Sequence, residues 1–109
     1  MKPNYRIVSP SDEDGSSEIP LVKSPIHIDY GINMDIHPSC FINRDCYIAD
    51  TPETVVRIGE DTLVGMGVKI LGVTHPTHWE ERRGRMGPSL AGDVLIGRDC
   101  FIGAGAIVL

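Results

Sequence analysis

The chain has 109 residues, which is enough for one small domain. Its net charge of −5 argues against nucleic-acid binding, which would need a basic patch. No apolar run approaches the roughly 20 residues of a transmembrane helix, and residues 1–5 carry no apolar region of a secretory signal. We therefore expect a cytoplasmic protein that binds neither nucleic acid nor membrane.

The first 23 residues are polar and rich in turn-forming residues. Residues 9–17 in particular contain too little apolar surface to fold alone. We expect residues 1–23 to be a disordered lead-in and residues 24–109 to form the folded domain. Within that domain, residues 24–32 are expected to be an extended entry into the first repeat.

From residue 34 onward, aliphatic residues recur at a step of six in three groups. The next residue is often glycine, and the fourth residue after the aliphatic is small. A step of six matches neither the 3.6 of a helix nor the 2 of a flat strand. It is typical of a parallel β-helix built from hexapeptide repeats. The aliphatic positions are Ile36, Ile42, Ile48, Ile58, Val64, Ile70, Ile96, Ile102 and Val108.

The repeat predicts an all-β, left-handed parallel β-helix of about three coils. Three hexapeptides would form one triangular coil, with each aliphatic side chain inside and the glycine allowing the backbone to bend. Successive coils would then place equivalent aliphatic residues above one another. The expected stacks are Ile36–Ile58–Ile96, Ile42–Val64–Ile102 and Ile48–Ile70–Val108.

Two interruptions divide the repeat. Residues 51–54 contain proline and polar residues, so we expect a surface bulge after the first coil. The second coil is expected over residues 56–74. The step from Ile70 to Ile96 is then 26 residues, and residues 75–88 show no aliphatic period. This predicts one long protruding loop, and long loops on a regular scaffold are common places for function.

All three cysteines occupy the small position of the repeat: Cys40, Cys46 and Cys100. We interpret them as buried, free thiols rather than as metal ligands or disulfides. Free thiols also fit a reducing compartment. A catalytic zinc would need three protein ligands, and no third histidine has a fitting place beside His75 and His78. No metal is therefore expected.

His75 is the main candidate for catalysis, because a neutral imidazole is the usual general base near pH 7. The following Pro76 restricts its backbone to an extended conformation. Taken alone, such a His–Pro pair is more often structural. By spacing alone, Asp29, Asn43 and Asp50 are turn residues at corners of the coils.

Five short motifs occur in a fixed order along residues 28–107. They are Asp29-Tyr30-Gly31, Phe41-Ile42-Asn43-Arg44-Asp45-Cys46, Thr74-His75-Pro76, Glu80-Glu81-Arg82-Arg83 and Ile96-Gly97-Arg98-Asp99-Cys100-Phe101-Ile102-Gly103. In this order they resemble the maltose/galactoside O-acetyltransferase family of hexapeptide-repeat acyltransferases.

The resemblance implies transfer of an acetyl group from acetyl-CoA to a hydroxyl of a sugar or similar small acceptor. It also implies a homotrimer, with each active site between adjacent β-helices. His75 would be the catalytic base. The acceptor would be contacted by Asp29, Asn43, Asp50, Met86 and Phe101.

The chain departs from the family pattern in three places. The usual N-terminal helical segment is replaced by the polar lead-in, and Phe101 stands where many relatives carry tryptophan. The repeat also ends at Leu109, whereas relatives continue through coils that hold much of CoA. The alternative interpretation is therefore a truncated, non-catalytic scaffold or oligomerisation module that cannot hold CoA, and no CoA-contacting residue is predicted.

Overall fold

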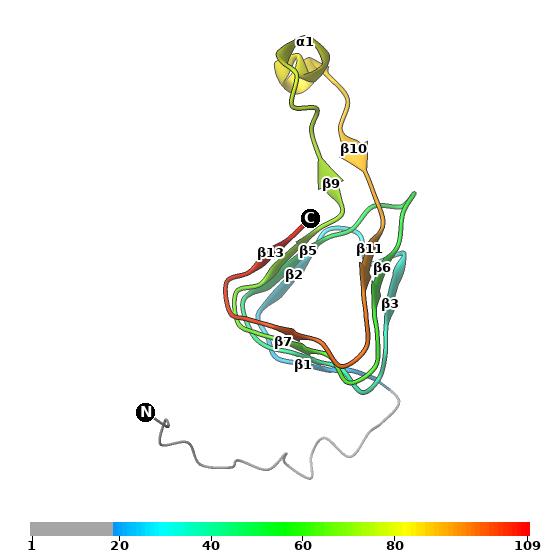
Figure 1. Ribbon diagram of the computed structural model, residues 1–109, viewed down its shortest axis with the longest axis vertical. Coiled ribbons are helices and arrows are strands. Elements are labelled where there is room, and N and C mark those ends of the chain that lie inside the picture. The colour runs from blue at the N-terminus through cyan, green and yellow to red at the C-terminus, as the bar shows by residue number, and fades with distance from the viewer. Residues whose placement is uncertain (1–18) are drawn as a thin grey trace.

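The computed structural model describes residues 19–109, which form three parallel sheets around a triangular cross-section (Figure 1). Sheet A contains β1 (Leu21–Val22), β4 (Phe41–Ile42), β7 (Leu63–Val64) and β12 (Phe101–Ile102). Sheet B contains β2 (Ile26–Ile28), β5 (Cys46–Ala49), β8 (Lys69–Leu71) and β13 (Ile107–Val108). Sheet C contains β3 (Met34–Ile36), β6 (Val56–Ile58) and β11 (Val94–Ile96). This arrangement is consistent with a parallel β-helix.

Strand register confirms the three stacks predicted from the step of six. In sheet C, Ile36 lies beside Ile58, which lies beside Ile96 on the next coil. The same register joins Ile42, Val64 and Ile102 in sheet A, and Ile48, Ile70 and Val108 in sheet B. Each inward side chain therefore meets its counterpart on the neighbouring coil.

The stack begins earlier than the predicted first coil. Strand β1 pairs with β4, so Val22 lies beside Ile42, and β2 pairs with β5, so Ile28 lies beside Ile48. Strand β1 falls within the segment predicted to be a lead-in, most of which lies outside the described residues. The division of the chain at residue 24 stays a prediction.

The core is a column of β-branched side chains between the three sheets. Ile42, Ile48, Ile58 and Ile70 are each at most 1% exposed. Burying one such side chain stabilises the fold by about 1.5–3 kcal/mol. The prediction for the cysteines is confirmed for two of them: Cys40 and Cys46 are buried, Cys100 is partly buried, and all three thiols are free.

The corners turn at a different residue from the one predicted. The backbone adopts left-handed φ values at the third residue after the aliphatic position, not at the glycine that follows it directly. These corner residues are Asp45, Asp61, Gly67, Asp99 and Gly105, with φ between 55° and 76°. Aspartate and glycine are among the residues that tolerate this region best.

The glycine directly after the aliphatic residue is needed for close stacking of the coils. A Cβ atom on Gly59 would lie 2.7 Å from the backbone of Gly97, and one on Gly65 would lie 2.8 Å from the backbone nitrogen of Ala104. We predicted that the glycine lets the backbone bend. At Gly59 and Gly65, the absence of a Cβ atom instead prevents a clash with the next coil.

Some of the small residues at the fourth position donate a hydrogen bond as well as filling the interior. The Cys40 thiol donates to the carbonyl oxygen of Gly59 at 3.0 Å, and the buried Thr62 hydroxyl donates to that of Gly97 at 2.9 Å. Each side chain therefore supplies a hydrogen bond to a backbone carbonyl of the adjacent coil.

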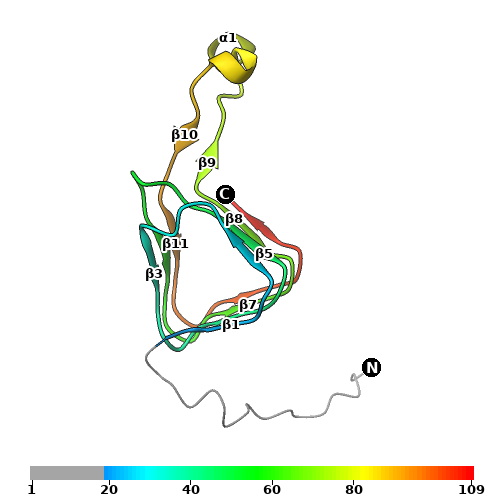
Figure 2. The same ribbon diagram turned by 180° about the vertical axis from the view of Figure 1, so that it is seen from behind.

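The long loop forms an arm, residues 73–91, that projects from one corner of the triangle (Figures 1 and 2). Its base is an antiparallel pair of β9 (Val73–Thr74) and β10 (Leu90–Ala91), and its far end holds α1 (Trp79–Arg82) and the 3-10 helix η2 (Gly84–Met86). The second coil thus ends at Leu71 rather than at Thr74 as predicted, because β9 pairs with β10 instead of with the coil below. Neither short helix of the described chain could cross a membrane.

Candidate active site

Several predicted site residues lie where sheet B meets sheet C, at the corner of the triangle from which the arm projects. We call this place the arm corner. It consists of residues 29–33, 50–55 and 72–93, the three segments by which the chain passes from sheet B to sheet C. Because the coils stack, these segments lie above one another along the edge from which the arm projects (Figure 1).

His75 follows β9 directly and is exposed to solvent, whereas the adjacent Pro76 is buried. Among the described residues, no side chain or backbone group hydrogen-bonds to the His75 imidazole. Both ring nitrogens are therefore open to a ligand. A general base needs this access to the hydroxyl from which it takes a proton.

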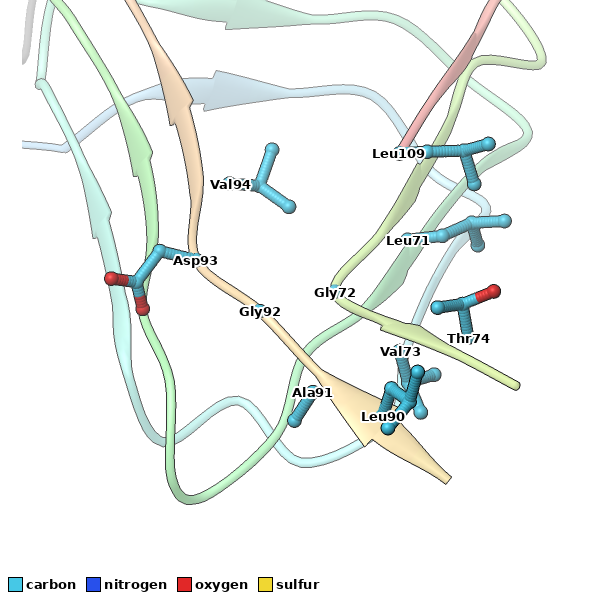
Figure 3. A pocket seen from close by; sticks show the side chains of 10 residues that line it. All are labelled: Leu71, Gly72, Val73, Thr74, Leu90, Ala91, Gly92, Asp93, Val94 and Leu109. Carbon is cyan, nitrogen blue, oxygen red and sulfur yellow. The ribbon is translucent and has the colours of Figure 1, made fainter. Parts of the chain in front are cut away.

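An apolar hollow of about 260 Å³ lies at the base of the arm, next to Thr74. Figure 3 shows that side chains from the arm and from the coils surround it. The Asp93 carboxylate points away from these apolar groups and accepts a hydrogen bond from the Val55 backbone N–H at 2.9 Å. The wall contains Leu71, Val73, Leu90, Val94 and Leu109.

Asp50 organises the turn at the arm corner. It is only 1% exposed, and its two oxygens accept hydrogen bonds from the backbone N–H groups of Tyr30, Gly31 and Ile32 at 2.8–3.2 Å. A buried carboxylate without such partners would carry a large desolvation cost. The predicted contact of Asp50 with an acceptor stays a prediction, and its contacts in the structure all go to this turn.

Asp29 belongs to a polar cluster on the outer surface of sheet B. The Tyr47 hydroxyl donates to Asp29 Oδ1 at 2.6 Å, and His27 Nε2 lies 3.7 Å from the same oxygen. The hydrogen bond from the phenol to this carboxylate raises the pKa of Tyr47, with smaller contributions from desolvation and from the Asp29 charge.

Asn43 and Phe101 are brought together elsewhere, on the outer surface of sheet A. Both line a shallow hollow of about 140 Å³, together with Phe41 and Leu63. Strand register places Phe41, Leu63 and Phe101 in one outward column, and Phe101 is 77% exposed. Asn43 Oδ1 accepts a hydrogen bond from the Arg44 backbone N–H at 2.8 Å.

The predicted site residues thus occupy three places. Asp29, Asp50 and His75 lie along the arm corner, whereas Asn43 and Phe101 line the shallow hollow on sheet A. Met86 lies in η2 at the far end of the arm and is 79% exposed. A single chain does not bring these three groups into contact.

Sequence reasoning missed His27 and Tyr47. The signal was available, because the same register that stacks Ile28 beside Ile48 also places His27 beside Tyr47. Separately, residues 19–109 contain no cluster of three or more histidine, cysteine or acidic residues suited to a metal ion.

Comparison with known proteins gives three informative relatives. Nodulation protein L of Rhizobium leguminosarum bv. viciae is 39% identical over 89 residues, which cover 82% of this chain and 45% of that protein. Nodulation protein L of Rhizobium meliloti (strain 1021) is 37% identical over 89 residues, covering 82% and 46%. A Schizosaccharomyces pombe protein named "Putative acetyltransferase" is 28% identical over 108 residues, covering 84% and 51%.

The chain spans about half the length of these relatives. No protein-family model matches it, and no solved structure matches significantly. Over most of its length, the chain is therefore similar to two nodulation proteins L and to a protein named as an acetyltransferase, and this similarity supports an acetyltransferase family.

Proposed function

We propose that this chain is the β-helix of an acetyl-CoA-dependent O-acetyltransferase, of the maltose/galactoside type, that acts on a hydroxyl of a sugar or similar small acceptor. The observation that carries the proposal is the position of His75. Its imidazole is exposed and free of hydrogen-bond partners among the described residues, and the residue before it, Thr74, lines an apolar hollow. Similarity to a protein named as an acetyltransferase supports the same reaction class.

In the proposed reaction, His75 takes the proton of the acceptor hydroxyl as its oxygen attacks the thioester carbonyl of acetyl-CoA. The new C–O bond forms the acetyl ester, the C–S bond breaks, and the proton leaves with CoA as its thiol. General-base catalysis of this kind typically contributes about 10²–10⁴-fold to the rate.

The proposal includes a left-handed coil and a homotrimer. In one chain, His75 lies at the arm corner while Asn43 and Phe101 lie on another part of the surface. A neighbouring copy could bring its Asn43 and Phe101 next to the His75 of the first chain. The exposed apolar column of Phe41, Leu63 and Phe101 supports burial of sheet A against another copy, since exposed apolar patches often mark interfaces.

The test is acetyl transfer from acetyl-CoA to a panel of sugars by the purified protein and by His75→Ala. We expect the substitution to reduce kcat by about 10²–10⁴-fold. His78→Ala is the matched control, because His78 lies on the same arm but its Nδ1 accepts the Glu80 backbone N–H at 3.3 Å and caps α1. Equal turnover by His75→Ala and the unsubstituted protein would refute the assignment.

The second candidate is a non-catalytic scaffold that joins other β-helices through sheet A. The exposed apolar column on that sheet favours it. A calorimetric titration with CoA separates the two functions, because the scaffold should not bind CoA, whereas the enzyme should.

A further inference from the structure

The cluster on sheet B joins three polar side chains from two adjacent coils. His27 on β2 lies beside Tyr47 on β5, and their rings stack with centroids 4.5 Å apart at an interplanar angle of 21°. The Tyr47 hydroxyl reaches past His27 to donate to Asp29 Oδ1 at 2.6 Å. The stacked ring and the hydrogen bond together hold the Tyr47 side chain in one orientation.

This arrangement fixes Asp29 from two sides. Its backbone N–H donates to the Ile48 carbonyl at 3.1 Å, and the turn that follows is held by Asp50. With Oδ1 engaged by Tyr47, the second oxygen, Oδ2, has no hydrogen-bond partner within residues 19–109. The Asp29 side chain is 29% exposed, so the carboxylate is partly open to solvent.

A carboxylate held in this way suits one kind of ligand. One oxygen is anchored to the protein, and the other can accept a hydrogen bond from a ligand hydroxyl in a defined direction. The cluster lies on the strand that leads into the arm corner, the edge that also carries His75. Asp29 and His75 lie on segments two coils apart along that edge, at least about 10 Å at roughly 4.8 Å per strand. An acceptor that contacts both residues must therefore carry hydroxyls that far apart.

We infer that Tyr47 is a positioning residue for acceptor binding: it orients the Asp29 carboxylate, with His27 as its packing partner, so that Oδ2 receives a second hydroxyl of a polyol acceptor. This inference rests on the proposed acetyltransferase function. It predicts that the protein prefers acceptors with at least two hydroxyls over simple alcohols. Tyr47 itself need not touch the acceptor.

Tyr47→Phe tests the inference, because it removes the hydrogen bond and keeps the stacked ring. With a sugar acceptor, we expect KM for the sugar to rise about tenfold, in line with the loss of one hydrogen bond to a charged group. We expect kcat and KM for acetyl-CoA to change less than twofold. With a monohydric alcohol as acceptor, the substitution should change little, so the preference for the sugar should fall.

A merely structural link between the coils would give a different result. Arg57→Met is the matched control, since Arg57 Nε contacts Asp35 Oδ2 at 3.2 Å and joins adjacent coils on sheet C. That variant should leave KM for the sugar unchanged. In the double variant Tyr47→Phe/Asp29→Asn, KM should match that of Asp29→Asn alone, because the two residues act as a unit.

Failure of this inference and failure of the proposed function would give different results. If the unsubstituted protein acetylates a sugar and His75→Ala does not, yet Tyr47→Phe keeps the same KM, this inference is wrong and the proposed function stands. If Tyr47→Phe lowers kcat for the sugar and the simple alcohol equally, Tyr47 is structural and the inference is again overturned. If His75→Ala keeps full turnover, the proposed function itself fails. Direct titration of the sugar onto Tyr47→Phe and the unsubstituted protein provides a readout without turnover, with weaker binding expected for the variant.

Discussion

The coil stack and the arm are built on opposite principles. In the coils, side chains such as Ile48 and Ile58 are at most 1% exposed and meet equivalent residues on the next coil. On the arm, Trp79 and Met86 are 68% and 79% exposed, and neither α1 nor η2 contains a buried residue. The coils therefore carry the stability of the fold, while the arm carries the proposed catalytic base without contributing much to the core.

This difference predicts that substitutions in one part have little effect on the other. A solenoid is stabilised by contacts between neighbouring repeats, so its stability is distributed along the stack. At its base, the arm is held by the antiparallel pair of two-residue strands β9 and β10. Substitutions in the arm beyond β9 and β10 should reduce activity more than folding stability. Substitutions in the stack should reduce folding stability more than activity.

The largest expected effect on stability is at the centre of the stack. Ile48 is 0% exposed and lies between Ile28 and Ile70. We expect Ile48→Ala to lower the free energy of unfolding by about 2–5 kcal/mol, because it leaves a cavity between stacked coils. Urea denaturation would measure the loss.

The matched substitution on the arm is Trp79→Ala. It removes a larger side chain, but that side chain is 68% exposed, so we expect a change within about 0.5 kcal/mol. Comparable losses for the two variants would contradict the division between coils and arm, since they would mean that the arm is part of the folding core.

The stack was predictable from sequence because burial imposes a strict pattern on it. Every sixth residue must be apolar because its side chain fills the interior. The strand register then follows when equivalent aliphatic residues of successive coils are paired, as with Ile42 and Val64. The corner residues were assigned wrongly because the repeat offers two candidate positions, and aspartate at the true position, as in Asp61, is also common in ordinary turns.

The arm and the candidate site were less predictable. No period marks β9, whose partner β10 lies beyond a long polar segment, so their pairing depends on tertiary structure. Only the family resemblance suggested His75 as the catalytic base, and that role stays a prediction. The link between Tyr47 and Asp29 depends on outward side chains, whose identity burial does not restrict.

Two glycines at equivalent places in the repeat sharpen the account of the coils. A Cβ on Gly65 would lie 2.8 Å from the Ala104 backbone, whereas one on Gly103 would meet nothing within 4 Å among the described residues. We expect Gly65→Ala to destabilise the protein by about 1–3 kcal/mol, because the coils must separate to admit the methyl group.

Gly103→Ala should instead leave stability unchanged or raise it by about 0.4–1 kcal/mol, since alanine restricts the unfolded chain. Thermal denaturation of both variants would measure the difference. A similar loss at both positions would indicate that backbone freedom, rather than clearance between coils, is the reason for the glycines.

The smallest expected effect concerns Tyr47, on the outer surface of sheet B. Its pKa is raised in the folded protein by the hydrogen bond to Asp29, so folding favours the protonated phenol. The resulting stabilisation is complete below the ordinary tyrosine pKa of 10.0 and is lost as the pH rises through the higher pKa of the folded state.

The melting temperature of the unsubstituted protein should therefore fall more steeply above pH 10 than that of Tyr47→Phe, which has no phenol to ionise at this position. Parallel curves for the two proteins would mean that the hydrogen bond to Asp29 is not maintained in solution, and the carboxylate would then lack the fixed orientation on which acceptor positioning depends.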